Sequence, residues 1–326
     1  MLKKIFIISA IIFLIICFLP FKKGVILNFK PVVNFKSDNT KKEANFYDSA
    51  TRKEYTKENI YSFVEDPDVN KNAPKIIAQS GIAIDLDTNT ILFSKNADME
   101  MPVASLVKVM TAILAMEHTD INSKVTISKN AADTGENTMG LLEGETFTVK
   151  ELLYGLILNS ANDASVAIAE KVAGSEDNFT DYMNIKAKLI GANNTLFVGA
   201  SGLNKKGKKY YSTSTDMARI AAYSLDNHPT LRQIYQTVYL ELPYSSNHGL
   251  KILENQTNLL TTYPGVKGIK TGYTEESGLC LISYAENDGK KVLVVVLNST
   301  DRKGDAILLL DYAFSRLGVT IEHNLL

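Results

Sequence analysis

Residues 278–297 read GLCLISYAENDGKKVLVVVL, two apolar runs on either side of Asn287-Asp288-Gly289. Apolar runs of this length joined by an Asp-Gly turn signal predict a β-hairpin. A second pattern of this kind lies far upstream. Ile76–Asp85 alternates apolar and small residues, and Ile91-Leu92-Phe93 follows a polar turn at residues 87–90. The sequence therefore predicts strands at both ends of the globular region.

Apolar residues elsewhere recur at the three-and-four spacing of amphipathic helices. The predicted helices are Ser105–His118, one capped by Thr148 and running to Leu158, Asn162–Val172, Asn178–Leu189, one capped by Ser214 or Thr215 and running to Tyr223, and Asp305–Leu317. Strands at the two ends with most helices between them indicate an α+β fold. In this fold one antiparallel sheet is built from both chain ends and packs against a helical region.

The composition excludes several classes of protein. The 326 residues hold 35 Lys and Arg against 36 Asp and Glu, so no excess of positive charge favours nucleic acid as a partner. Two cysteines, Cys17 and Cys280, cannot make a disulfide scaffold, and we expect no bridge between them. The 4 histidines are scattered without a compact metal-ligand spacing, so the sequence predicts no metal and no organic cofactor.

The first 23 residues have the pattern of an export segment. Lys3 and Lys4 precede the uncharged run Ile5–Phe21, and two further lysines close it. The run is just long enough to span a membrane, and no small-x-small cleavage site follows it. We expect residues 1–23 to be an uncleaved membrane anchor, with an atypical cleaved signal as the alternative. The remaining chain would then lie outside the cytoplasm.

The rest of the chain divides into a polar segment and a globular one. Residues 24–73 are rich in Lys, Asp, Asn, Glu and Thr, which predicts a tether, although its aromatic residues leave docking on the domain open. Globular patterning begins at Pro74. We therefore expect one catalytic domain over residues 74–326, without a C-terminal β-domain.

The tetrapeptide Ser105-Leu106-Val107-Lys108 is the only S-x-x-K sequence in the chain. Lys108 lies one helical turn after Ser105, on the same face. A serine hydroxyl needs an adjacent base to become a nucleophile, and a lysine amine serves when burial and nearby cations lower its pKa. The same four residues also fit a serine N-cap followed by an exposed lysine.

Ser160-Ala161-Asn162 is one of several S-x-N triplets, and its context distinguishes it from the others. It joins two strongly apolar predicted helices, whereas the triplets that begin at Ser37, Ser94, Ser128 and Ser245 lie in polar surroundings. Polar groups at an internal helix junction are costly unless satisfied, so they often face a cleft.

Lys270-Thr271-Gly272 is the only K-T-G sequence, on a predicted strand that follows a glycine-rich turn. A strand edge offers backbone groups to an extended peptide ligand. The lysine adds positive charge, the threonine adds a hydroxyl donor, and the glycine lacks the side chain that would block close approach. The alternative is an exposed edge strand that a lysine protects against aggregation.

The order of these three motifs resembles that of the penicillin-recognising serine enzymes of the β-lactamase/transpeptidase superfamily. More narrowly, the chain resembles the D-alanyl-D-alanine carboxypeptidases, the low-molecular-mass penicillin-binding proteins, from about Pro74 to Gly318. The resemblance implies that Ser105 is the acylated nucleophile, Lys108 its general base and Ser160 a proton relay to the leaving amine.

The resemblance also implies a set of substrate-binding residues. Asn162 would hold the substrate amide, and Lys270 would supply electrostatic stabilisation. Thr271, with Gly272 after it, would bind the terminal carboxylate with support from Arg302. Backbone N–H groups of Ser105 and Tyr273 would form the oxyanion hole.

The implied activity is removal of the terminal D-alanine from peptidoglycan pentapeptides, with β-lactams as inhibitors. Two alternatives stay open: D,D-endopeptidase or transpeptidase action on cross-links, and a non-catalytic penicillin-sensing protein that binds the cell wall. A β-lactamase is disfavoured, because Glu254 lies only 16 residues before Lys270 and does not match the glutamate that activates water in class A enzymes.

Overall fold

The computed structural model describes residues 46–48, 53–55, 61–203, 207 and 209–325. Strands β1 (Phe46–Asp48) and β2 (Lys53–Tyr55) form an antiparallel pair of their own. Within the described residues no helix is both long and apolar enough to cross a membrane. The run Ile5–Phe21, which carries the anchor hypothesis, lies outside them.

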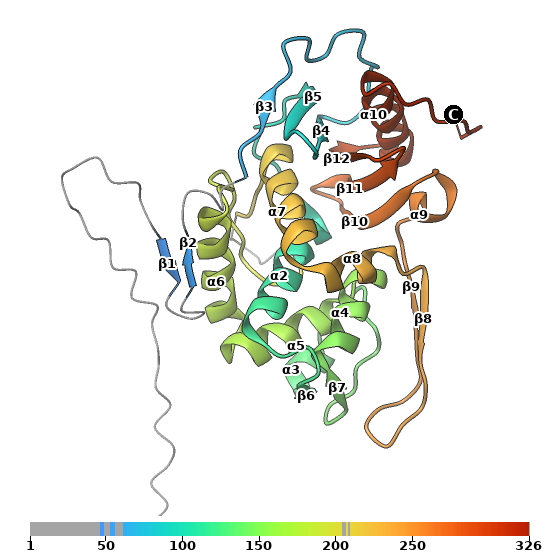
Figure 1. The fold of residues 1–326 in the computed structure, drawn as a ribbon. Coiled ribbons are helices and arrows are strands. Elements are labelled where there is room, and N and C mark those ends of the chain that lie inside the picture. The colour runs from blue at the N-terminus through green and yellow to red at the C-terminus, as the bar shows by residue number, and fades with distance from the viewer. Residues whose placement is uncertain (1–45, 49–52, 56–60, 204–206, 208, 326) are drawn as a thin grey trace, which may run out of the picture. The chain divides into compact units, whose positions relative to one another are not determined.

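A six-stranded sheet has the order β10-β11-β12-β4-β5-β3 (Figure 1). Its strands are β3 (Val64–Glu65), β4 (Ser80–Asp85), β5 (Thr90–Lys95), β10 (Val266–Thr274), β11 (Gly278–Asn287) and β12 (Lys290–Ser299). All neighbours are antiparallel except the pair of β3 and β5. Strand β12 pairs directly with β4, so the prediction of one sheet from both chain ends is confirmed.

The hairpin of β11 and β12 turns at Asp288 and Gly289, between the paired residues Asn287 and Lys290. Both turn residues have positive φ, at 46° and 72°. This is the geometry of a two-residue type I′ turn, which matches the twist of the strands that it joins and which favours Asp-Gly.

The position of β12 between two hydrophobic cores explains why its sequence is apolar without alternation. Val292, Val294 and Val296 belong to a core shared with helix α10 (Arg302–Arg316). The intervening Leu293 and Val295 belong to the core on the other face, shared with the helical region. Both faces of the strand are therefore covered, and every position from 292 to 297 is buried.

The helices of that region, together with two small hairpins, lie between β5 and β10 in the sequence. Short helix η2 (Ala104–Val107) leads into α2 (Lys108–His118). The others are α3 (Lys129–Ala132), α4 (Val149–Leu158), α5 (Asn162–Ala173), α6 (Glu176–Leu189), α7 (Ser214–Asn227), α8 (Pro229–Gln236) and α9 (Leu259–Thr262). The hairpins are β6 (Lys124–Thr126) with β7 (Thr146–Thr148), and β8 (Tyr239–Leu242) with β9 (Lys251–Glu254).

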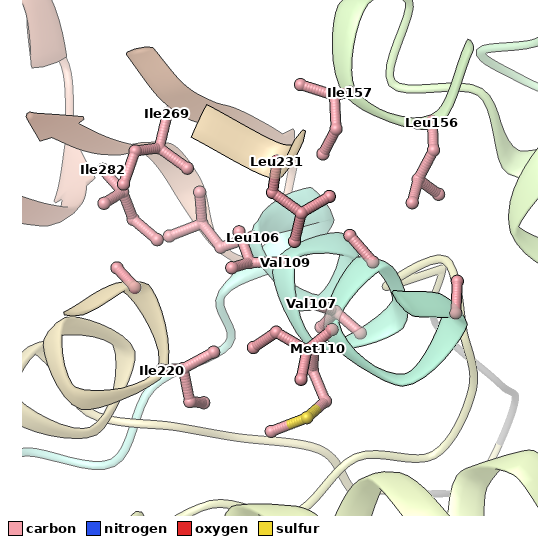
Figure 2. Close-up of a cluster of buried hydrophobic side chains, with 14 of the residues drawn as sticks. Leu106, Val107, Val109, Met110, Leu156, Ile157, Ile220, Leu231, Ile269 and Ile282 are labelled. Atoms are coloured by element: carbon pink, nitrogen blue, oxygen red, sulfur yellow. The ribbon is translucent and has the colours of Figure 1, made fainter. Parts of the chain in front are cut away.

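The start of α2 lies at the centre of the larger core (Figure 2). Leu106, Val109 and Met110 are buried among side chains from four neighbouring elements: Leu156 and Ile157 of α4, Ile220 of α7, Leu231 of α8, and Ile269 and Ile282 of the sheet. Each such side chain contributes about 1.5–3 kcal/mol by leaving water. The first turn of α2 is thus fixed in position by packing on all sides.

Helix caps confirm one prediction and correct another. Thr148 caps α4 through a capping box with Glu151, as its sequence predicts. Helix α7 is capped by Thr213 rather than by Ser214 or Thr215, because the Thr213 hydroxyl accepts from the backbone N–H of Asp216.

The packed domain also begins earlier than the expected boundary at Pro74. The hydroxyl of Tyr61 donates to Asp226 at 2.8 Å, and its ring packs edge-on against Tyr223. Strand β3 then joins the sheet, and Arg316 binds Asp66 at 2.9 Å. Residues 61–73 therefore dock on the domain through aromatic and charged side chains, which is the alternative left open for part of the predicted tether over 24–73.

Candidate active site

Ser105 lies within η2, and Lys108 is the first residue of α2. The Lys108 ammonium donates to Ser105 Oγ at 2.9 Å, to Asn162 Oδ1 at 2.7 Å and to the carbonyl oxygen of Ser201 at 2.6 Å. Lys108 is fully buried, and Ser105 caps no helix. The alternative of a serine N-cap before an exposed lysine is therefore wrong.

The surroundings of Lys108 lower its pKa well below the usual value. Burial is the larger cause, and the positive charge of Lys270 is the second. The negative charges of Glu136 and Asp163 act in the opposite direction. A neutral amine this close to a serine hydroxyl is able to accept its proton, which is what activation of the nucleophile requires.

The backbone around Ser105 is held in an uncommon conformation by close contacts. Ala104 has a φ of 46°, in the left-handed region that residues with a Cβ seldom occupy. A Cβ on Gly202 would lie 2.2 Å from the Ala104 carbonyl oxygen, and one on Gly272 would lie 3.1 Å from the Ser105 nitrogen. Glycine at these positions lets two segments approach the backbone around Ser105 closely.

Ser160 connects α4 and α5 in a second uncommon conformation, with a φ of 57°. Its Oγ is buried and has no hydrogen-bond partner among the described residues. An unsatisfied buried hydroxyl costs about 1–3 kcal/mol, which marks it as a group available for a ligand or a proton transfer.

Asn162 ties Lys108, and through it Ser105, to an adjacent loop. Its side-chain amide donates to the Gly135 carbonyl at 3.1 Å, and its backbone N–H donates to the Asn137 carbonyl at 2.7 Å. The neighbouring Asp163 accepts from the backbone N–H groups of Met139 and Leu141. The sequence analysis missed this loop, although the two polar residues directly after Ser160-Ala161 were a signal for it.

Strand β10 carries Lys270 and Thr271 at the edge of the sheet, and both side chains are buried. The Lys270 ammonium donates to the Thr271 carbonyl at 3.1 Å, and Arg302 donates to the Gly272 carbonyl at 2.8 Å. A lysine that only protects an edge strand would be exposed, so that alternative is wrong.

The cations of β10 and α10 form a positive end of the site. Burial, and secondly the charge of Arg302, lower the pKa of Lys270 to about 7. Burial also lowers the pKa of Arg302. Two desolvated cations and a hydroxyl suit a carboxylate ligand, which would relieve their repulsion.

The site residues that the sequence singled out are connected to different degrees. Hydrogen bonds join Ser105, Lys108 and Asn162, and the charge of Lys270 acts on Lys108. The Tyr273 side chain is 60% exposed, so only its backbone is a candidate for the site. Within the described residues no group of three His, Cys, Asp or Glu side chains could hold a metal ion. A serine hydroxyl bonded to a buried amine, with two cations nearby, is the arrangement that serine enzymes of acyl transfer use.

Comparison with known proteins gives the family. Residues 68–301 match the model of the Peptidase_S11 family, D-alanyl-D-alanine carboxypeptidase. The chain is 37% identical to D-alanyl-D-alanine carboxypeptidase DacF of Bacillus subtilis, over 73% of this chain and 62% of that protein. It is 32% identical to DacB2 of Mycobacterium tuberculosis, over 73% of this chain and 82% of that protein.

A solved structure agrees with the sequence relatives. The crystal structure of the Streptomyces K15 DD-transpeptidase has a TM-score of 0.70 and 32% identity, covering 74% of this chain and 99% of that one. The chain belongs to the D-alanyl-D-alanine carboxypeptidase family of serine hydrolases. Members of this family act on the bacterial cell wall, in general outside the cytoplasm. The chain spans less than two thirds of the Bacillus relative.

Proposed function

We propose that this chain is a serine D-Ala-D-Ala carboxypeptidase that removes the terminal D-alanine from peptidoglycan pentapeptides. The observation that supports it most is the hydrogen bond of 2.9 Å between Ser105 Oγ and the buried Lys108 amine, whose pKa is lowered. Buried Lys270 and partly buried Arg302 near β10 support binding of the carboxylate at the end of such a peptide.

In the proposed reaction, neutral Lys108 accepts the proton of Ser105 while Oγ attacks the carbonyl carbon of the penultimate D-alanine. Backbone N–H groups of Ser105 and Tyr273 donate to the resulting oxyanion. Collapse breaks the C–N bond, and Ser160 passes a proton to the leaving D-alanine amine. Water then cleaves the ester and restores Ser105. Asn162 holds the substrate amide, and Thr271, Lys270 and Arg302 hold its terminal carboxylate.

An intact-mass time course with benzylpenicillin, beside an assay of D-alanine release from a pentapeptide, tests the proposal. The wild type should gain one long-lived penicilloyl group and release D-alanine, and Ser105→Ala should do neither. Ser315→Ala, an exposed serine on α10, is the matched control and should behave as the wild type. D-alanine release that persists in Ser105→Ala contradicts the assignment of the nucleophile. A transient adduct with loss of the drug indicates a β-lactamase, and binding of peptide without product indicates a non-catalytic binder.

Likeness to a DD-transpeptidase supports a second candidate, transfer of the acyl group to an amine instead of water. The acyl-enzyme is common to both reactions, so the test measures how it divides between water and an amine acceptor. Glycyl acceptor peptides added to the pentapeptide assay should leave free D-alanine and the tetrapeptide as the main products. A ligated peptide as the main product would favour the transpeptidase.

We also propose that residues 1–23 anchor the enzyme to the outer face of the cytoplasmic membrane. The support is the uncharged run Ile5–Phe21 between two pairs of lysines, without a small-x-small site after it. Mass spectrometry of the N-terminus of protein recovered from membranes tests this. An intact Met1 region supports the anchor, and a new N-terminus after Phe21 contradicts it.

A further inference from the structure

Glu136 lies on the loop that is hydrogen-bonded to Asn162 of the site. The carbonyl oxygens of its two neighbours, Gly135 and Asn137, accept hydrogen bonds from Asn162 at 3.1 and 2.7 Å. Asn162 accepts from the Lys108 ammonium at 2.7 Å. The backbone of Glu136 is therefore held between two hydrogen bonds to the residue that touches the catalytic lysine.

The loop that carries Glu136 is fixed rather than free. The Asp163 carboxylate accepts from the backbone N–H groups of Met139 and Leu141, at 3.0 to 3.1 Å, and it is buried at the start of α5. Glu136 itself has a φ of 63°, which a residue with a Cβ adopts only where its surroundings impose it. The backbone that carries this side chain is thus held by hydrogen bonds on both sides.

The carboxylate of Glu136 is available to a ligand. Its side chain is exposed, and no described residue forms a hydrogen bond or ion pair with it. Its charge nevertheless raises the pKa of Lys108, so the carboxylate lies within Coulombic reach of the catalytic ammonium. An exposed acid whose charge acts on the buried base, on a loop bonded to Asn162, is placed to meet a ligand of this site.

The charges of the site are therefore divided between two ends. Lys270 and Arg302 lie on the β10 side, where the proposed function puts the terminal carboxylate. Asn162, which would hold the peptide upstream of the cleaved bond, lies on the side of Glu136. A peptide bound with its carboxylate at the cations directs its preceding residue towards Glu136.

We propose that Glu136 is a specificity-determining residue that pairs with a free side-chain amine on the residue preceding D-Ala-D-Ala. The preferred substrate is then a peptide with a diamino acid at that position and with its side-chain amine uncapped. The inference deepens the proposed carboxypeptidase function and rests on it.

The test compares two tripeptides that differ only in one charge, Nα-acetyl-L-Lys-D-Ala-D-Ala and its Nα,Nε-diacetyl form. The wild type should cleave the free-amine peptide with a kcat/KM about fivefold higher at low salt, as expected for a solvent-screened ion pair, and added salt should reduce the ratio. In Glu136→Gln the ratio should fall to about 1. Glu143→Gln, an exposed acid further along the same connection, should keep the wild-type ratio.

The ratio separates substrate recognition from an effect on the catalytic lysine. A change in the pKa of Lys108 alters both peptides equally, so equal losses with an unchanged ratio contradict the proposal. The wild type alone gives a second measurement, because an Nε-succinyl peptide should be cleaved more slowly than the diacetyl one. Equal rates for these two peptides also contradict it. Failure of the wild type to cleave any peptide or to bind benzylpenicillin would instead refute the carboxypeptidase function.

Discussion

Replacing Lys270 with methionine removes a buried amine that the folded state holds at an energetic disadvantage. Lys270 is 1% exposed, and its pKa falls from an ordinary 10.5 to about 7 because of burial and of the charge of Arg302. Methionine has a similar length and keeps most of the packing. The variant should therefore lose activity and gain stability.

The magnitude follows from the displacement of the pKa. Below pH 7 both the folded and unfolded chains hold the proton, and the folded state carries the full penalty of about 5 kcal/mol. Between pH 7 and 10.5 only the unfolded chain holds it, so the stability of the wild type rises with pH. At pH 7 the penalty is about 4 kcal/mol. Loss of the hydrogen bond to the Thr271 carbonyl subtracts about 1 kcal/mol.

Urea unfolding of the wild type and Lys270→Met at pH 7, 8 and 9 measures this effect. The variant should be more stable by about 3 kcal/mol at pH 7, and the difference should shrink by about 1 kcal/mol from pH 7 to 8 and by about 1.3 kcal/mol from pH 8 to 9. Lys290→Met, an exposed lysine at the start of β12, should show a small difference that does not change with pH. A Lys270→Met variant that is no more stable at pH 7, or whose advantage does not change with pH, would refute the reasoning.

Three further predictions concern other parts of the site and its support. Gly272→Ala should slow acylation by benzylpenicillin about tenfold in stopped-flow, because its Cβ would lie 3.1 Å from the Ser105 nitrogen; an unchanged rate would show that the close approach is dispensable. Thr148→Ala should lower the free energy of unfolding by about 1 kcal/mol through loss of the capping box, and a neutral result in urea unfolding would contradict that role. In Arg302→Leu the pKa of Lys270 should rise above 7, because a repelling charge is gone. The pH at which the acylation rate falls on the alkaline side should therefore be higher in this variant than in the wild type. An unchanged pH for this fall would mean that another group titrates there.

The parts of the fold that the sequence predicted are those with strong local signals. The turn at Asp288-Gly289 and the cap at Thr148 depend on a few adjacent residues, and both lie where predicted. The alternating apolar and small residues of β4 and the continuous apolar run of β12 also follow from local pattern, because both strands are buried in a sheet covered by helices. The pairing of β12 with β4 was reached by analogy with α+β proteins, not from the residues themselves.

The features that the sequence missed depend on contacts between distant segments. The loop at Glu136 is held by hydrogen bonds to Asn162, and the residues of the loop itself do not predict these bonds. The docking of Tyr61 on α7 likewise needs a partner more than a hundred residues away. The positive φ of Ala104 and Ser160 is imposed by packing, since neither residue type favours that conformation.

The burial of Lys108 is another feature that depends on contacts between distant segments. A lysine at the start of a helix is ordinarily exposed, and the flanking apolar residues give only a weak indication of burial. In the structure α2 is surrounded on all sides, so its polar residue is buried along with its apolar ones. The motif suggested the chemistry, and only the packing shows why the amine has a low pKa.

The pairing of β4 with β12 has a consequence for folding during synthesis on the ribosome. The ribosome synthesises residue 80 more than two hundred residues before residue 297, and these two residues are partners in the sheet. Until the last strands emerge, β4 and β5 present an unpaired edge, which is the kind of surface that chaperones protect and that aggregation exploits. A chain that stops short of β12 contains Ser105, Lys108 and Lys270 but lacks Arg302 and the strand that joins β10 and β11 to β4. Reactivity towards penicillin would then report not only that the serine is present but also that synthesis has reached its end.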